Sequence, residues 1–352
     1  MRKVLIINLL SITIFLFATC HETERYENTS LFSFKDFKST TKLNATTIEF
    51  DEPIMLPFLF VKSDSLLIVQ NIRTNNLLFV YNVNSRKKIG EFISFGSGPN
   101  DLLRIKNMQL VGSYLYISDS QKRTVSKYNI KDFHESTGSL LPIHKVTIEH
   151  PFNNIAYTEN GYVATAMTPD NKRLVFYNSE GEKAFATGEY PYFGKDLTII
   201  EKMEGFSSCF AVSHKYKRIY LFGNTTDLIE IYDFKGKLIK QIHGPEQIFP
   251  QAKEVSLPNG MARVSALEKS TFAFFHPIIV DDEIYVSYSG NHYNIEEQNV
   301  TIQHILVFDM DGSPLRKYEL SKSIVSFTVD PETKSIYAAS NIPDYHLVIF
   351  EE

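Results

Sequence analysis

Hydrophobic and polar positions alternate along most of this chain in short runs that predict β-strands. The clearest run recurs six times, and each copy ends in an aromatic residue that is usually followed by Asn or Asp. These aromatic residues are Tyr81, Tyr128, Tyr177, Tyr232, Phe308 and Phe350. A second apolar run precedes each copy across a short polar turn. The repeat is roughly fifty residues long, which is the length of one blade of a β-propeller.

Two further strands complete each repeat. An inner strand precedes the central pair, as in 58–64, and a more charged outer strand follows it, as in 87–95. The sixth pair has no outer strand after it, because the sequence ends at Glu352. We expect residues 46–50 to supply that strand, since closing the ring removes the free sheet edges of an open array. The sequence therefore predicts an all-β fold, a six-bladed β-propeller of four-stranded antiparallel blades whose ring is closed by an N-terminal strand.

Composition and charge add two restrictions. No run has the apolar spacing of a long helix, and aromatic residues are frequent, with 27 Phe and 19 Tyr. The formal net charge of −5 argues against a nucleic acid as partner. We expect a single domain over 46–352, because propellers are long for single units.

The first twenty residues predict export. Two basic residues precede an apolar stretch, 4–17, which is long enough for the core of a signal peptide and too short for a comfortable membrane span. The stretch ends in FATC, so Cys20 stands where a bacterial lipoprotein signal has the cysteine that is acylated. We expect a signal peptide over 1–19 and a lipid anchor on Cys20. Ordinary cleavage near Ala18, with Cys20 unmodified, is the alternative.

The number of cysteines supports the lipid anchor. Cys209, the other cysteine, lies in an apolar inner strand and is expected to be a buried free thiol. An exported protein without a disulfide framework uses the cysteine after its signal for something other than folding. Residues 20–45 are polar and predict a tether between the lipid and the ring. The expected location is the outer membrane, with the propeller facing the periplasm or the cell surface.

These features together resemble those of a known family. A lipobox, a polar segment, six blades and the turn GSGPND (96–101) are similar to the TolB-like six-bladed propeller lipoproteins of bacteria with two membranes. The most specific pieces are FGSGPNDLLRIKN (95–107) and DDEIYVSYSG (281–290). The resemblance implies a fold and a place in the cell envelope. It implies no chemistry, because a fold alone does not carry function.

Three long connections indicate which face of the ring carries function. Connections between blades, and those from the second to the third strand of a blade, emerge on one face of a propeller. The three longest excursions, 190–206, 245–273 and 290–303, are all of these types, and long loops commonly carry binding residues. They contain Tyr190, Tyr192, Phe193, Phe249, His292 and Tyr293. The alternative for each of these rings is that it packs its loop onto the blades.

A basic arc is expected on the same face. The turns inside blades one to three carry Arg73, Lys122 with Arg123, and Lys172 with Arg173. Around one half of the rim these groups would meet carboxylate, sulfate or phosphate groups, and solvated turn residues are the alternative. The ligand-binding residues that we expect are Arg73, Arg123, Arg173, Tyr192, His276, Tyr288 and Tyr293.

Catalytic and metal sites have little support in the sequence. Propeller lactonases and related esterases hold calcium with carboxylate and amide oxygens at the starts of the inner strands. The corresponding positions here carry amides, a serine and His276, without a carboxylate. The histidines lack the paired spacing of zinc sites, no GxSxG motif occurs, and Cys209 has no base partner. We expect no catalytic residue, no metal and no cofactor. His276 is the one inner-strand histidine expected to face the channel, with a satisfied core histidine as the alternative.

The sequence therefore favours an exported, lipid-anchored propeller that serves as a non-catalytic module and binds a ligand or protein at the cell envelope. The expected partner is a small molecule, a glycan or an envelope protein, besides the membrane itself. One alternative is a metal-dependent hydrolase or lyase acting at the channel mouth, which tightly bound calcium or zinc would favour. Another is a structural subunit of an envelope complex, which co-purification with a membrane protein would favour.

Overall fold

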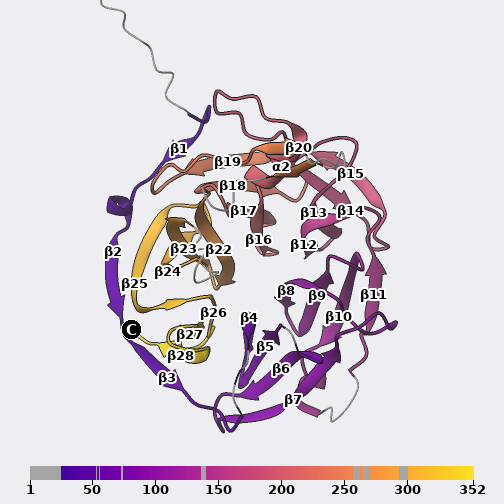
Figure 1. The fold of residues 1–352 in the computed structure, drawn as a ribbon, viewed down its shortest axis with the longest axis vertical. Helices are drawn as coiled ribbons and strands as arrows, with labels where there is room; N and C mark the ends of the chain where they lie inside the picture. Colours follow the sequence, from indigo (N-terminus) through magenta and orange to yellow (C-terminus); the bar gives the residue numbers. More distant parts are fainter. Residues whose placement is uncertain are drawn as a thin grey trace, which may run out of the picture.

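Six β-sheets stand around a central channel, each with its first strand at the channel and its last strands at the rim (Figure 1). The computed structural model describes residues 25–352 apart from 53, 55, 73, 136–139, 257–261, 265–269 and 293–299. The four strands that form each blade are antiparallel neighbours, which confirms the predicted six-bladed propeller. No helix in the described part of the chain has the length and apolarity needed to cross a bilayer.

The first three blades use consecutive strands. Blade 1 contains β4 (Pro57–Ser63), β5 (Leu66–Asn71), β6 (Asn76–Asn82) and β7 (Lys87–Ser94). Blade 2 contains β8 (Ile105–Val111), β9 (Tyr114–Asp119), β10 (Thr124–Asn129) and β11 (His144–Thr147), with the short helix α1 (Asp132–Glu135) after β10. Blade 3 contains β12 (Phe152–Thr158), β13 (Gly161–Ala166), β14 (Leu174–Tyr177) and β15 (Lys183–Thr187).

The last three blades also take strands from the N-terminal segment. Blade 4 contains β16 (Ser208–Ser213), β17 (Arg218–Gly223), β18 (Leu228–Asp233), β19 (Leu238–His243) and β1 (Ser30–Leu31). Blade 5 contains β22 (Thr271–Val280), β23 (Glu283–His292), β24 (Ile302–Asp309), β25 (Pro314–Ile324) and β2 (Ser39–Leu43). Blade 6 contains β26 (Ser326–Val329), β27 (Ile336–Ser340), β28 (His346–Phe350) and β3 (Ala45–Ile48).

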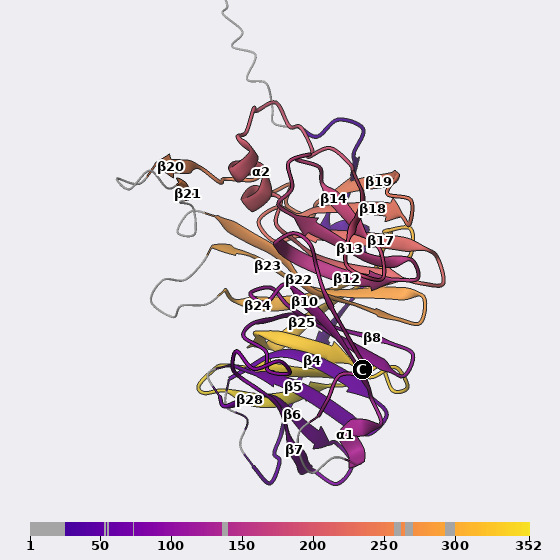
Figure 2. The same cartoon turned by 90° about the vertical axis from the view of Figure 1, so that its right-hand side faces the viewer.

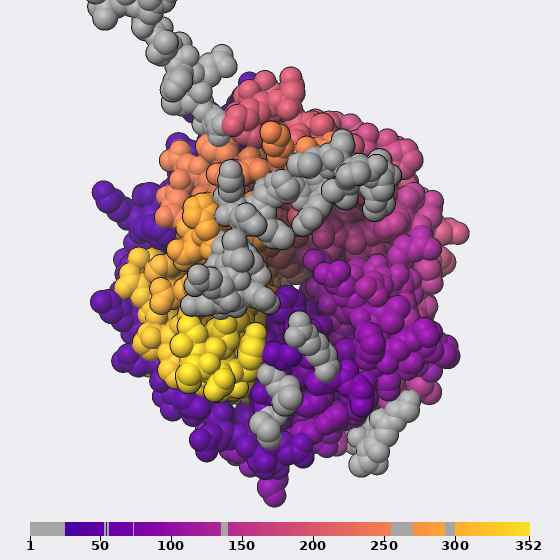
Figure 3. Space-filling model, in the orientation of Figure 1, coloured from indigo at the N-terminus to yellow at the C-terminus, as the bar shows by residue number. Residues whose placement is uncertain are grey.

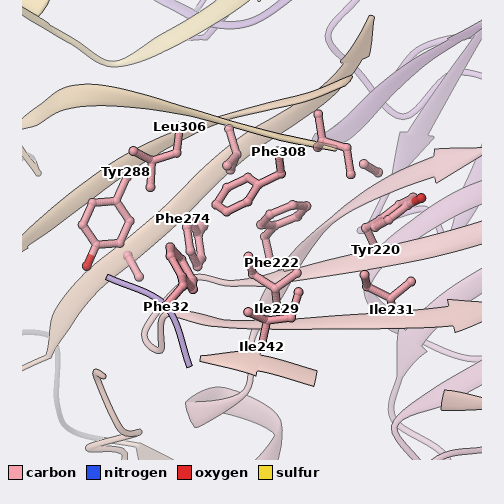
Figure 4. Packing of buried hydrophobic residues seen from close by; sticks show 14 of the residues in the cluster. Phe32, Tyr220, Phe222, Ile229, Ile231, Ile242, Phe274, Tyr288, Leu306 and Phe308 are labelled. Atoms are coloured by element: carbon pink, nitrogen blue, oxygen red, sulfur yellow. The ribbon is translucent and has the colours of Figure 1, made fainter. Parts of the chain in front are cut away.

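Packing between blades explains the aromatic repeat. All six aromatic residues at the ends of the third strands are buried, with exposed fractions of 2% or less. Between blades 4 and 5, Phe222 meets Phe274 with ring centroids 5.4 Å apart, and Phe308 packs beside them (Figure 4). Large aromatic side chains bury more apolar area than aliphatic ones, so one at each blade end holds neighbouring sheets together.

The N-terminal strand closes the ring as predicted. β3 pairs antiparallel with β28, the third strand of blade 6, with Leu347 opposite Ile48 and Phe350 opposite Ala45. Ile48 is buried against residues of blades 1 and 6. The two ends of the chain thus share one sheet, and the edge of β28 is covered.

The predicted polar tether over 20–45 is wrong for residues 25–43, which lie along the ring as an edge strap. β1 pairs in parallel with β19, and β2 pairs in parallel with β25, so each adds a fifth strand to its blade. Between them the short 3-10 helix η1 (Phe34–Asp36) starts at a capping box in which the Ser33 amide donates to Asp36 at 2.7 Å. Burial of the apolar side chains fixes the strap despite its polar composition. These buried residues are Tyr26, Phe32, Phe37 and Leu43.

Three elements outside the blades lie on one face of the ring. They are α2 (Ile199–Gly205) and the hairpin of β20 (Glu254–Ser256) and β21 (Ala262–Val264), which project toward the same side of the disc in Figure 2. This side, called the upper face below, carries the described elements of two of the long connections expected from the sequence, 190–206 and 245–273. The inner strands begin at the upper face and end at the lower one.

Candidate ligand-binding site

A cavity of about 320 Å³ occupies the upper end of the channel, at the starts of the inner strands. Every blade contributes to its wall. The inner-strand residues that represent the six blades are Phe58, Asn107, Asn154, Cys209, His276 and Ser326. A second cavity, of about 380 Å³, lies at the lower end of the channel. The channel opens near the centre of the disc in Figure 3. Both volumes are within the range of small-molecule sites, roughly 300–1,000 Å³.

β-Bulges interrupt four inner strands at the height of the upper cavity. The register of pairing shifts between Pro57 and Phe60, Ile105 and Asn107, Phe152 and Asn154, and Phe275 and Ile278. The inner strands of blades 4 and 6 pair without a shift. A bulge bends its strand and re-aims the extra side chain. The residues within these bulges include Phe58, Lys106, Asn153 and His276, and three of them line the cavity.

Lys106 is the one lysine or arginine that lines the upper cavity in the described structure. It is half-buried, and no hydrogen bond or ion pair to another residue engages its ammonium group in the part of the chain that the structure describes. Burial lowers the pKa of this ammonium, and the positive charge of Arg104 lowers it further. The Cys209 and Glu204 side chains oppose that decrease in pKa. The cavity therefore contains a cation without a fixed partner.

α2 brings Glu204 to the mouth of the cavity. The helix begins at Thr198, whose hydroxyl accepts from the Glu201 amide at 3.2 Å while its own amide donates to the Glu201 carboxylate at 2.9 Å. The same carboxylate accepts the Glu254 amide at 2.9 Å, which joins α2 to the β20 strand. Glu204 follows on the last turn, is exposed, and lines the cavity. The Glu201–Glu254 hydrogen bond thus joins two long connections at the mouth of the cavity.

Two chemically reactive residue types in the wall are held in uncharged forms. Burial lowers the pKa of His276 to about 4, and its ring packs edge-on to Phe58 with centroids 6.0 Å apart. Burial raises the pKa of the Cys209 thiol to about 12. That thiol lies 3.5 Å from the Phe222 carbonyl oxygen. At neutral pH the wall therefore offers a neutral imidazole and a thiol, and neither is poised as a nucleophile.

A chain of polar side chains fixes the wall between blades 3, 4 and 5. The Asn153 amide donates to the Ser207 hydroxyl at 3.0 Å, and that hydroxyl donates to the Asn224 carbonyl at 3.2 Å. The Asn224 amide in turn donates to the backbone carbonyl of Phe274 at 2.9 Å. These bonds set the side chains before any ligand arrives, which reduces the entropy lost on binding.

Arg173 does not stand exposed on the rim, so the position expected for it is wrong. It is 2% exposed, and its guanidinium donates to the Glu230 carboxylate at 2.7 and 2.8 Å and to the Ser208 hydroxyl at 2.7 Å. Its charge is therefore neutralised between blades 3 and 4. The Tyr190 ring lies 5.6 Å from the guanidinium carbon and covers it.

The remaining residues of the predicted basic arc each bind a different partner within the protein. Arg123 is exposed in the turn between β9 and β10, and its guanidinium donates to the Glu149 carbonyl at 3.0 Å. The Lys122 ammonium donates to two backbone carbonyls, and Lys172 pairs with Glu189. Arg73 lies outside the described residues. Of the two described arginines, Arg123 is exposed and Arg173 is buried, so the structure does not bring them together at one surface.

The tyrosines predicted to bind a ligand also differ in their exposure. Tyr192 is 54% exposed on the loop before α2, where a partner can reach it. Tyr288 is buried, donates its hydroxyl to Glu246 at 2.7 Å, and has its pKa raised mainly by burial, so it is not open to a ligand. Tyr293 lies outside the described residues.

The other loop rings mostly pack inward, as the alternative interpretation held. Phe193 and Phe249 stack with centroids 5.5 Å apart and enclose Tyr26 of the strap. Tyr190 packs on Phe206 at 6.0 Å. His292 is exposed. Sequence reasoning could not separate these two groups, because both are aromatic side chains in long loops.

Lys106 was missed at the sequence level, although the specific segment 95–107 contains it. Two lysines hold the turn 96–101 by hydrogen bonds to its backbone. The Lys122 ammonium donates to the Gly98 and Asp101 carbonyls at 2.7 and 2.6 Å. The Lys145 ammonium donates to the Pro99 carbonyl at 2.6 Å. A Cβ atom on Gly98 would lie 2.6 Å from the Asp101 carboxylate, so a larger residue there would displace that side chain. This rigid turn leads directly into β8 and fixes where Lys106 enters the channel.

Comparison with known proteins agrees with this architecture. Residues 33–332 match the family model described as TolB-like 6-blade propeller-like. The chain belongs to the TolB-like family. No curated protein sequence matches it.

Solved structures support the fold of this TolB-like protein. A member of the DUF4221 family from Bacteroides vulgatus superposes with a TM-score of 0.56 at 10% identity, over 88% of this chain and 97% of its own. A Bacteroides fragilis protein whose name classes it as exported gives 0.53 at 12% identity, over 91% and 99% of the two chains. Identities this low establish the fold and leave the ligand open.

Proposed function

We propose that this TolB-like protein is an exported, lipid-anchored binding module whose ligand occupies the upper cavity of the channel. The observation that carries the proposal is the convergence of six inner strands on one cavity, with bulges in four of them. Bulges are frequent beside functional sites, where they re-aim side chains. The export motif at Cys20 and the likeness to an exported Bacteroides protein support the location.

The chemistry of the wall favours binding over metal-dependent hydrolysis. A calcium site needs several oxygen ligands, typically including carboxylates, whereas Glu204 is the one carboxylate lining the upper cavity in the described structure. Among the described residues, no three His, Cys, Asp or Glu side chains are grouped so as to hold a metal ion. Aromatic rings, amides and one ammonium are instead groups that recognise a molecule without transforming it.

The experiment that tests the binding site uses Phe58, which lines the upper cavity and is 46% exposed. A library of envelope-derived small molecules and glycan fragments is screened against the purified protein by thermal shift. Phe58→Ala is expected to weaken any ligand at least tenfold, because an aromatic anchor at a site centre contributes about 2 kcal/mol or more. Tyr216→Ala is the matched control, since Tyr216 is 40% exposed and follows the lower end of β16.

Two results would contradict the proposal. One is a set of ligands whose affinities are equal in wild type and Phe58→Ala. The other is a ligand that ignores Phe58 but loses affinity on Lys235→Ala or Lys237→Ala, because those lysines lie in the turn between β18 and β19 on the lower face.

The proposed anchor gives a separate prediction. Cys20→Ala should move the protein from the membrane fraction to the soluble fraction, because each buried methylene of an acyl chain contributes about 0.8 kcal/mol of membrane affinity. Cys209→Ala is the control and should stay with membranes. Fractionation of cells followed by immunoblotting measures both, and membrane retention of the Cys20 variant would exclude the lipid anchor there.

A lipid anchor on Cys20 and the edge strap would together hold the propeller close to the membrane. Tyr26 is fixed against blade 4 and lies six positions after Cys20 in the sequence. Six residues span at most roughly 20 Å. A lipid on Cys20 would therefore hold the blade 4 rim near the membrane, in place of the long free tether that the sequence indicated.

A further inference from the structure

Lys106 in the upper cavity differs from the other enclosed cations of the ring, because it has no fixed partner among the described residues. Elsewhere, enclosed cations have fixed partners: Lys62 pairs with Asp330 at 2.7 Å, and Arg173 with Glu230 at 2.7 Å. Lys122 and Lys145 satisfy their ammonium groups on backbone carbonyls. Lys106 has no such partner among the described residues, although it is half-buried. An ammonium removed from water without a partner is unfavourable, so this position calls for a negative group from outside the chain.

The charges around Lys106 leave a positive field inside the cavity. His276 and Cys209, the titratable groups of the wall in blades 4 and 5, are neutral at pH 7 because burial holds the pKa of one low and of the other high. Glu204 is exposed at the mouth of the cavity, where water screens its carboxylate. Arg104, two residues before Lys106, is exposed as well, so water screens its positive charge in the same way and Lys106 remains as the enclosed charge. An anion that enters past the mouth therefore meets a net positive field in a protein whose formal charge is −5.

The cationic groups that line the upper cavity favour one class of anion over others. A phosphate or sulfate is best held by planar guanidinium groups or by several cations, and no arginine lines the cavity in the described structure. One ammonium suits one negative charge. The remaining wall includes the partly exposed rings of Phe58, Phe272 and Phe275, which suit the flat or apolar face of a ring. The volume, about 320 Å³, accommodates a single-ring molecule of this kind.

From these features we infer that the upper cavity binds a small ring-bearing monocarboxylate, with its carboxylate on the Lys106 ammonium and its ring against the phenylalanines of the wall. The inference rests on the proposed function, because it names the ligand class of the same cavity. Sugar acids and aromatic acids share this chemistry, and the test separates them.

The first arm of the experiment measures binding by calorimetry to the purified mature protein. The probes are glucuronate and benzoate, each compared with its methyl ester, which keeps the ring and removes the charge. At least one acid is expected to bind, with its ester at least tenfold weaker. Lys106→Met should weaken the acid at least tenfold and leave the ester unchanged. Lys202→Met, on the same face in α2, is the control and should bind as wild type does.

The second arm needs no ligand. Because the half-buried Lys106 ammonium has no partner among the described residues, Lys106→Met is expected to keep or raise the midpoint of thermal unfolding. A fall in that midpoint would assign Lys106 a structural partner and overturn the inference.

The outcomes separate this inference from the proposed function. If neither acid binds, or if acid and ester bind equally to wild type and Lys106→Met, the carboxylate inference is overturned. A neutral ligand from the screen that still depends on Phe58 would then leave the binding module intact. Ligands whose affinity depends on neither Phe58 nor Lys106 would contradict both the proposed function and the carboxylate inference.

Discussion

A propeller that lacks residues 45–48 is expected to lose several kcal/mol of stability, a large part of the roughly 5–15 kcal/mol of a typical domain. β3 is the last strand of blade 6, and its removal uncovers the edge of β28. It also removes Ile48, whose burial alone contributes about 1.5–3 kcal/mol. The ring would then stand open between blades 6 and 1, since Ile48 packs against residues of both.

Three nested truncations measure this effect by thermal unfolding. They begin at Arg25, Asn44 and Asp51, so the second lacks the edge strap and the third also lacks β3. The strap buries Tyr26, Phe32 and Leu43, so a drop at the first step is expected. The second step should remove cooperative unfolding. Equal midpoints for the chains beginning at Asn44 and Asp51 would show that the ring closes in some other way.

A matched pair of substitutions tests the same contact without shortening the chain. Ile48→Lys places a charge in the packed interface of blades 1 and 6, whereas Thr47→Lys places it at an exposed position of the same strand. Only the first should lower the unfolding midpoint, because burying an unpaired charge is strongly unfavourable.

The fold was predictable because its signal is local and repeated. Alternating strands and one aromatic residue per blade specify a closed ring, and the need to cover the edge of β28 identifies the closing strand. The edge strap was not predictable, because β1 is two residues long and its partner in β19 is distant in sequence. Phe32 and Phe37 were the available signal, and their polar surroundings concealed it.

The site was predictable only in part, for a different reason. The position of His276 in an inner strand was enough to predict that it faces the channel, and it lines the cavity from the middle of β22. Lys106 depends on a bulge, and a bulge leaves no mark in the alternation of residues. Arg173 was misplaced because its partner, Glu230, belongs to the next blade, and sequence spacing alone cannot show that the two charges meet.

The buried pair of Arg173 and Glu230 gives the second large expected effect. Arg173→Ala should reduce the free energy of unfolding by about 3–5 kcal/mol, since it leaves the Glu230 carboxylate buried without its cation. Tyr232 would remain as one donor to that carboxylate, at 2.8 Å, which is too little to replace a charge. Arg123→Ala is the matched control, and its exposed side chain should change stability by about 0.5 kcal/mol or less.

A double-mutant cycle determines whether the loss comes from the orphaned carboxylate or from the missing arginine itself. The cycle compares Arg173→Met, Glu230→Leu and the variant with both, which removes both charges and keeps apolar volume; by urea unfolding the double variant should regain most of the stability lost in Arg173→Met. Recovery would identify the pair as a neutralised contact between blades 3 and 4. If Arg173→Ala instead keeps full stability but weakens the binding of an anionic ligand, Arg173 would belong to a binding site after all, and its ion pair would be an alternative to the bound state.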